Sequence, residues 1–128
     1  MSSGIIGAVF VLTGLLNAYP AIGMFGPLQL RELYGLDFSD PDLLTLMQHR
    51  AVMLGLIGAF LIAAAFRREL QPAAFMLGFV SMLSFVVFAW LQHDPNPFIG
   101  RVMLADVIGS ALLFVALMVY LFRGWNGW

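Results

Sequence analysis

The chain has 128 residues, of which 62% are hydrophobic and 10% are charged, with a formal net charge of −1. Soluble domains are about 45–50% apolar and about 25% charged, so this composition excludes an ordinary soluble domain and indicates an integral membrane protein. The balanced charge argues against nucleic-acid binding, and the lack of cysteine and lysine excludes thiol chemistry and Schiff-base cofactors.

Four apolar stretches reach the roughly 20 residues that a bilayer requires. The first covers residues 4–25, and because no basic segment precedes it we expect a retained span rather than a signal peptide. The others cover residues 43–66, 72–91 and 98–122. The last two connections are short, which makes successive spans antiparallel neighbours. The sequence therefore predicts an all-α fold, an antiparallel four-helix transmembrane bundle in which residues 1–128 form one domain.

The connection of residues 26–42 is the longest polar segment. Its LQLREL motif, residues 28–33, predicts a short helix at the membrane surface. Ser39, Asp40 and Asp42 provide capping side chains for the second span, and Pro41 suits its first turn.

The placement of arginine predicts the orientation of the spans. Arg67 and Arg68 lie between the second and third spans and Arg123 follows the fourth, whereas the 26–42 connection holds four acids and one arginine. Because cytoplasmic segments are enriched in basic residues, we expect both termini to be cytoplasmic and the 26–42 connection to face outward. The predicted location is the bacterial inner membrane.

Polar residues gather at one predicted depth. At 1.5 Å per residue, His49 and Arg50 lie roughly 10 Å inside the outer end of the second span, and Asp106 lies about 12 Å inside that of the fourth. The predicted layer in the outer leaflet comprises Asn17, Tyr19, Gln48, His49, Arg50, Arg101 and Asp106. A charge at a helix centre costs about 2.5–3.5 kcal/mol in insertion scales, so we predict an ion pair between Arg50 and Asp106.

This layer has three interpretations. It locks the helices together, or it lines a ligand or substrate pocket under the 26–42 connection, since ionisable groups inside a membrane often mark functional sites. The third is a metal or haem site formed by His49 and His93, but the two histidines lack a metal-binding spacing, so no metal site is predicted.

Small residues repeat at intervals of four along three spans. This pattern allows close helix packing in lipid, within the monomer or across a homodimer. The predicted packing residues are Gly14, Ala18, Gly55, Ala59, Ala63, Ala105 and Gly109.

The segments LYGLDFSDPDLLTLMQHRAVMLGLIGAF, AAFRRELQPAAFMLGFVSMLSF and RVMLADVIG resemble a family of small proteobacterial four-span proteins that are DoxX-like in layout. The similarity covers residues 34–109, and QHRAV and LADV are its most specific parts. It implies the four-span fold and no established activity. Some members are labelled phosphopantetheine adenylyltransferase, but this sequence has neither a phosphate-binding glycine loop nor an HxGH motif.

We therefore expect a protein that acts by binding, either as an accessory subunit of a larger membrane complex or as a binder of a lipid or quinone in the outer-leaflet layer. The expected partners are the lipid bilayer and a larger membrane complex or a second copy of the chain. No cofactor is evident apart from such a lipid or quinone. The alternative is a membrane enzyme that acts on an apolar substrate, an isomerase or a quinone-linked redox component, with His49 and Asp106 as proton-transfer groups.

Overall fold

The computed structural model describes residues 2–92 and 96–125, and the side chains of residues 4–92 and 96–123. Its elements follow in the order α1 (Ser2–Ala18), η1 (Tyr19–Phe25), α2 (Pro27–Tyr34), α3 (Pro41–Phe66), η2 (Arg68–Leu70), α4 (Gln71–Leu91) and α5 (Pro97–Trp125). The described residues contain helices and no strands, which confirms the predicted all-α fold.

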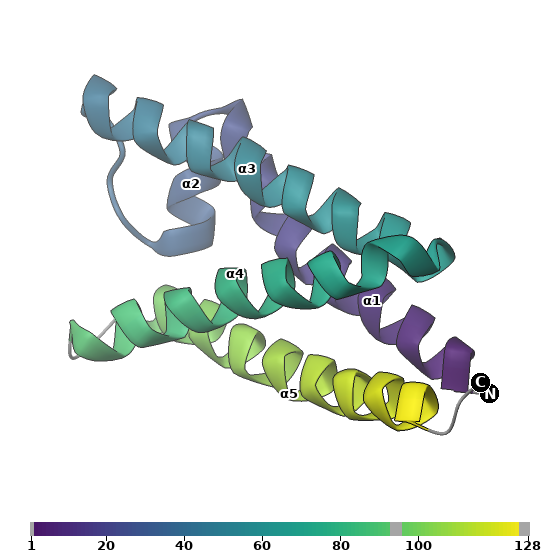
Figure 1. The fold of residues 1–128 in the computed structure, drawn as a ribbon. Helices are drawn as coiled ribbons and strands as arrows, with labels where there is room; N and C mark the ends of the chain where they lie inside the picture. Colours follow the sequence, from purple (N-terminus) through teal and green to yellow (C-terminus); the bar gives the residue numbers. More distant parts are fainter. Residues whose placement is uncertain (1, 93–95, 126–128) are drawn as a thin grey trace.

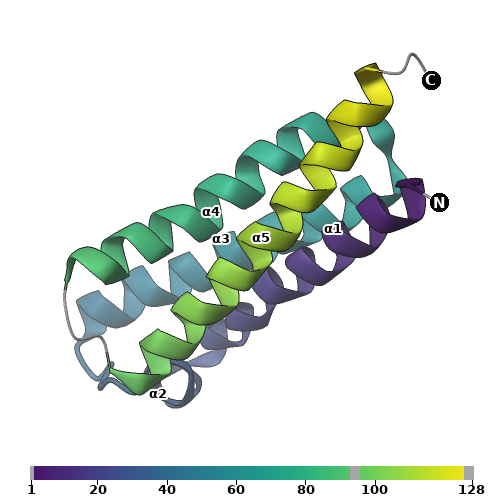
Figure 2. The same ribbon diagram turned by 90° about the horizontal axis from the view of Figure 1, so that it is seen from below.

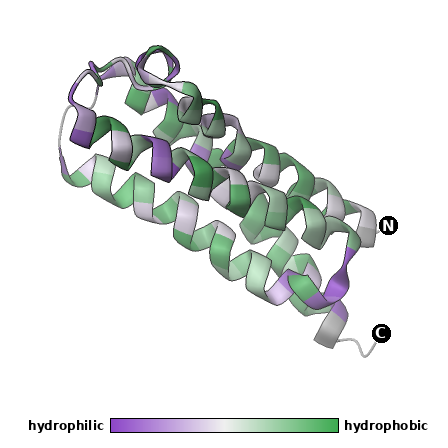
Figure 3. Ribbon diagram, turned by 90° about the horizontal axis from the view of Figure 1, so that it is seen from above, coloured by the Kyte–Doolittle hydropathy of each residue, from purple (hydrophilic) through white to green (hydrophobic). Residues whose placement is uncertain are grey.

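Within the described ranges, four helical segments are long and apolar enough to cross a membrane: Gly4–Phe25, Pro41–Phe66, Arg68–Leu91 and Pro97–Arg123. They match the predicted spans to within four residues at each end. Hydrophobic residues cover the length of these helices, and hydrophilic residues gather mainly at the two ends of the bundle (Figure 3). Length and composition thus indicate a multi-pass membrane protein.

The four long helices form a bundle in which α1 packs against α3 and α5, and α4 packs against α5 and α3 (Figures 1 and 2). The beginning of α1 and the end of α5 lie at one end of this bundle (Figure 2). The short helix α2 lies at the opposite end, which we call the α2 end. The LQLREL motif lies inside α2, so a helix forms there as predicted.

Local sequence signals explain where the helices begin and change. The first span is an α-helix only to Ala18 and continues as the 3₁₀ helix η1, because Pro20 lacks the N–H that an α-helix would use there. The side chain of Asp40 accepts hydrogen bonds from the N–H groups of Asp42 and Leu43 and so caps α3 as predicted. Gly35 ends α2 in the left-handed conformation, with φ of 68°, which favours glycine.

The helices α1 and α3 approach each other closely, backbone to backbone. A Cβ atom at Gly58 would lie 2.5 Å from the carbonyl oxygen of Gly14 and 2.7 Å from the Cβ of Ala18. Of the predicted packing residues, Gly14 and Ala18 lie in this contact, Gly55 approaches Ala21 of η1, and Gly109 approaches Met82 of α4. The other three lie elsewhere: Ala59 is exposed, Ala63 is half-buried, and Ala105 is half-buried in α5.

Two hydrophobic clusters hold the bundle together. The larger joins α1, α3, α4 and α5, with the Phe75 ring 4.8 Å from the Phe10 ring and 5.4 Å from the Tyr120 ring. The smaller lies at the α2 end and is centred on Leu30, Tyr34 and Phe38. The two clusters share no buried residue, and the candidate site lies between them.

Candidate functional site

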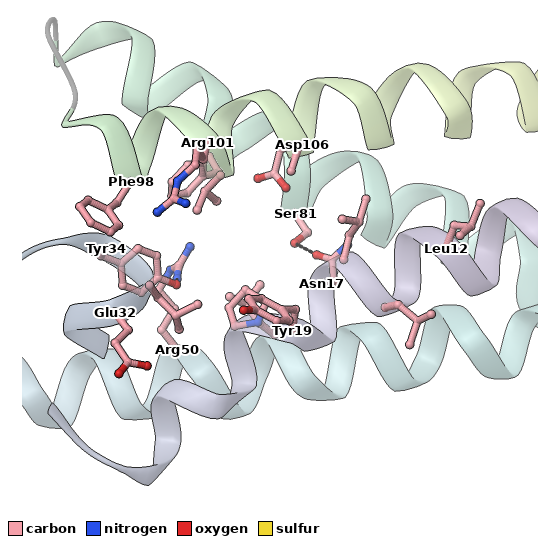
Figure 4. Close-up of a pocket in the computed structure, with 18 of the residues that line it drawn as sticks. Leu12, Asn17, Tyr19, Glu32, Tyr34, Arg50, Ser81, Phe98, Arg101 and Asp106 are labelled. Carbon is pink, nitrogen blue, oxygen red and sulfur yellow. Dashed lines mark hydrogen bonds between the residues drawn. The ribbon is translucent and has the colours of Figure 1, made fainter. Parts of the chain in front are cut away.

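A cavity of about 620 Å³ lies between the two clusters, with a lining drawn from α1, η1, α2, α3, α4 and α5. Leu33 and Val102 of its lining belong to the margin of the smaller cluster, and Leu112 belongs to that of the larger one. The volume lies in the range of about 300–1,000 Å³ that is typical of small-molecule sites. Figure 4 shows the lining residues.

The cavity opens at the side of the bundle between α1 and α5. Among its lining residues, Leu12, Leu15 and Tyr19 of the first span are exposed, as are Phe98 and Arg101 of α5. Leu12 and Leu15 lie inside a segment that is long and apolar enough to cross a membrane, so in a bilayer this side of the opening would lie at the depth of the hydrocarbon. A molecule dissolved in the membrane could therefore enter sideways.

Five of the seven predicted polar residues line this cavity: Asn17, Tyr19, Arg50, Arg101 and Asp106. They come from the first span, α3 and α5, and all five line the same cavity. Glu32, Tyr34, Ser81, Phe85 and Phe98 also line it and were not predicted as site residues.

The predicted Arg50–Asp106 ion pair is wrong. Both residues line the cavity, but among the described residues these two form no ion pair. Arg50 instead donates a hydrogen bond from Nη1 to the hydroxyl of Tyr34. Its guanidinium carbon lies 5.3 Å from the centre of the Tyr34 ring and 5.4 Å from that of Phe85, within cation–π range.

Tyr34 takes this position because the 26–42 connection folds back over the end of the bundle. The residue is buried in the smaller cluster. Asn96 donates a hydrogen bond of 2.8 Å to the Tyr34 carbonyl oxygen, and Asn96 Oδ1 accepts one of 2.8 Å from the N–H of Ile99. Asn96 thus ties the end of α2 to the beginning of α5. Tyr34 precedes Arg50 by 16 residues and lies in a different helix. The spacing of residues within one helix therefore gives no signal that these two side chains meet.

His49 and Gln48 lie outside the cavity lining. Successive residues on an α-helix point about 100° apart, so when Arg50 faces the cavity His49 faces away, and its side chain is exposed. Gln48 donates a hydrogen bond of 3.0 Å to the Met24 carbonyl oxygen and so ties α3 to η1. His49 and Asp106 therefore share no site in this structure, and His93 lies outside the described residues.

A second polar contact joins two helices of the bundle, further from the α2 end than Arg50 and Arg101 (Figure 4). The Ser81 hydroxyl donates a hydrogen bond of 2.7 Å to Asn17 Oδ1, joining α4 to α1 (Figure 4). The Asn17 amide donates its own bond of 2.9 Å to the Thr13 carbonyl oxygen. Asn17 is 5% exposed, so these bonds satisfy a polar group that would be costly to bury alone.

Arg101 and Asp106 are the charged residues of α5 at the cavity. The Arg101 guanidinium carbon lies 4.7 Å from the centre of the Phe98 ring. Asp106 is half-buried. No group of three or more histidine, aspartate or glutamate residues that could hold a metal ion occurs within residues 2–92 and 96–125.

No family model, curated protein or solved structure matches this chain. The similarity to DoxX-like proteins therefore stays a prediction.

Proposed function

We propose that this multi-pass membrane protein binds one amphipathic molecule of the bilayer, a lipid or a quinone, in the cavity between α1 and α5. The observation that supports this most strongly is the distribution of polarity around the cavity. The lining includes Leu12, Leu15 and Leu16 of α1. Arg50 and Arg101 lie toward the α2 end of the cavity, and Leu12 lies at the opposite end (Figure 4). An amphipathic molecule has the same division between an apolar tail and a polar head.

The predicted orientation gives this binding a direction. With both termini in the cytoplasm of a bacterial cell, the α2 end lies at the outer surface of the inner membrane. The head group would then bind in the outer leaflet beneath α2, and the tail would leave through the opening into the hydrocarbon. The accessory-subunit and enzyme hypotheses stay predictions, since no described contact favours either.

A cavity-filling substitution tests the proposal. Ala105→Phe adds a ring to the cavity lining, and Ala111→Phe is its matched control because Ala111 is exposed on the same helix. Each variant is extracted from its membrane in mild detergent and examined by native mass spectrometry.

We expect the wild type and Ala111→Phe to retain one molecule with the mass of a lipid or quinone, and Ala105→Phe to lose it. Equal retention by all three proteins would contradict the proposal. Retention of another protein in place of a small molecule would favour the accessory-subunit hypothesis.

A further inference from the structure

We infer that the α2 end of the cavity is an oxyanion site, in which Arg50 and Arg101 together bind the phosphate or carboxylate of the bilayer molecule. This inference rests on the proposed function and specifies the chemistry of the head group. The two arginines come from α3 and α5, and both side chains point into the part of the cavity next to Tyr34 (Figure 4).

Both guanidinium groups have N–H donors that make no hydrogen bond to the described residues. A guanidinium carries five N–H donors. Arg50 uses one of them on the Tyr34 hydroxyl. Arg101 contacts the face of the Phe98 ring and makes no hydrogen bond to another described residue. The arginine fork fits the oxygens of a carboxylate or phosphate with two parallel bonds.

The cavity lining also holds two carboxylates, and neither forms an ion pair with these arginines among the residues that the structure describes. Asp106 lies five residues beyond Arg101 on α5, about 7.5 Å further along the helix axis, and forms no ion pair with either arginine within the described part of the chain. Glu32 is exposed on α2 and likewise pairs with neither. An oxyanion bound between the two guanidinium groups would lie toward Tyr34, on the side of the arginines away from Asp106 (Figure 4).

The surroundings hold the arginines in place before a ligand arrives. Tyr34 positions Arg50 and is itself held by Asn96 and by the smaller cluster. Phe98 lies against Arg101 on the same turn of α5. Donors that are already oriented lose less entropy on binding. A neutral quinone carbonyl would accept one such hydrogen bond but would bring no negative charge to the two arginines.

The test compares three probes in detergent micelles by native mass spectrometry titration: phosphatidylglycerol, which carries a phosphodiester; oleate, which carries a carboxylate; and ubiquinone, which carries no oxyanion. Arg101→Gln is the principal variant because the Arg101 side chain makes no hydrogen bond to another residue within 2–92 and 96–125. Arg50→Gln is the second variant. Arg31→Gln is the matched control, since Arg31 is exposed on α2 and does not line the cavity.

We expect at least one oxyanion probe to bind the wild type and Arg31→Gln equally. It should bind Arg101→Gln and Arg50→Gln about tenfold or more weakly, the loss expected for a missing charge-assisted hydrogen bond. Whichever oxyanion probe binds more tightly, phosphatidylglycerol or oleate, identifies the preferred head group as a phosphate or a carboxylate. Unchanged binding of both oxyanion probes to Arg101→Gln would overturn the inference. Ubiquinone bound independently of the arginines would overturn it while leaving the proposed function intact. No probe bound, together with no effect of Ala105→Phe, would overturn both.

Discussion

The contact between α1 and α3 yields a sharp prediction at Gly58. In an open helix, alanine is more stable than glycine by about 1 kcal/mol, so Gly58→Ala would stabilise α3 if space allowed. The structure leaves no space, because the new methyl carbon would lie 2.5 Å from the Gly14 carbonyl oxygen and 2.7 Å from the Ala18 backbone nitrogen. Backbone atoms cannot rotate away, so the helices must separate.

Overpacking of this kind costs about 1–3 kcal/mol. After the gain in helix propensity is subtracted, we expect Gly58→Ala to lower the free energy of unfolding by up to about 2 kcal/mol, and by about 1–3 kcal/mol relative to a glycine-to-alanine change that meets no neighbour. The measurement is the loss of helical circular dichroism as sodium dodecyl sulfate is titrated into the protein in mild detergent. Gly100→Ala is the control, since nothing lies within 4 Å of a Cβ at that position of α5. Equal or greater stability of Gly58→Ala relative to Gly100→Ala would refute the close approach of α1 and α3.

The same unfolding titration tests two polar contacts of the site. Tyr34→Phe removes the hydroxyl that accepts a hydrogen bond from Arg50 and should lower the free energy of unfolding by about 1.5–3 kcal/mol. Tyr19→Phe is the control and should change it very little, because Tyr19 is 66% exposed. Equal losses in the two variants would count against the Arg50 contact. Ser81→Ala removes the hydrogen bond from α4 to α1 and should cost about 0.6–1.7 kcal/mol. Ser84→Ala should change little because its hydroxyl bonds only within α4, and a Ser81 variant as stable as this control would contradict the link between the helices.

The sequence predicted the depth of the site better than its contacts. Counting residues from the ends of the spans placed Arg50, Arg101 and Asp106 in one layer, and all three line one cavity. Depth does not tell which way a side chain points around the helix axis. His49 is adjacent to Arg50 in the sequence yet faces away. The partner of Arg50 is Tyr34 of the 26–42 connection, a segment expected to lie over a pocket but from which no partner of Arg50 was predicted.

The contacts between helices were likewise only partly predictable from the spacing of residues along one helix. Intervals of four residues identified Gly14, Ala18, Gly55 and Gly109 but also favoured Ala59 and Ala63 on α3, where the closest contact is made by Gly58. Four residues turn an α-helix by about 400°, so a strict interval of four drifts around the surface by about 40° at each step. The line of contact on α3 instead runs through Ala51 and Gly58, seven residues apart, and both are buried. Which of several small residues meets a neighbour depends on the crossing of two helices, and one helix alone does not contain that information.

Site-specific photocrosslinking tests most directly whether a bilayer molecule occupies the cavity. A photoreactive benzoylphenylalanine replaces Phe85, which lines the cavity, or Phe88, which lies one turn further on α4 and is 64% exposed. After irradiation in the membrane, the adducts are identified by mass spectrometry. Occupancy of the cavity predicts one dominant amphipathic adduct at position 85 and, at position 88, a mixture that follows the composition of the bulk lipid. The same mixture at both positions, or no adduct at position 85, would contradict binding in the cavity.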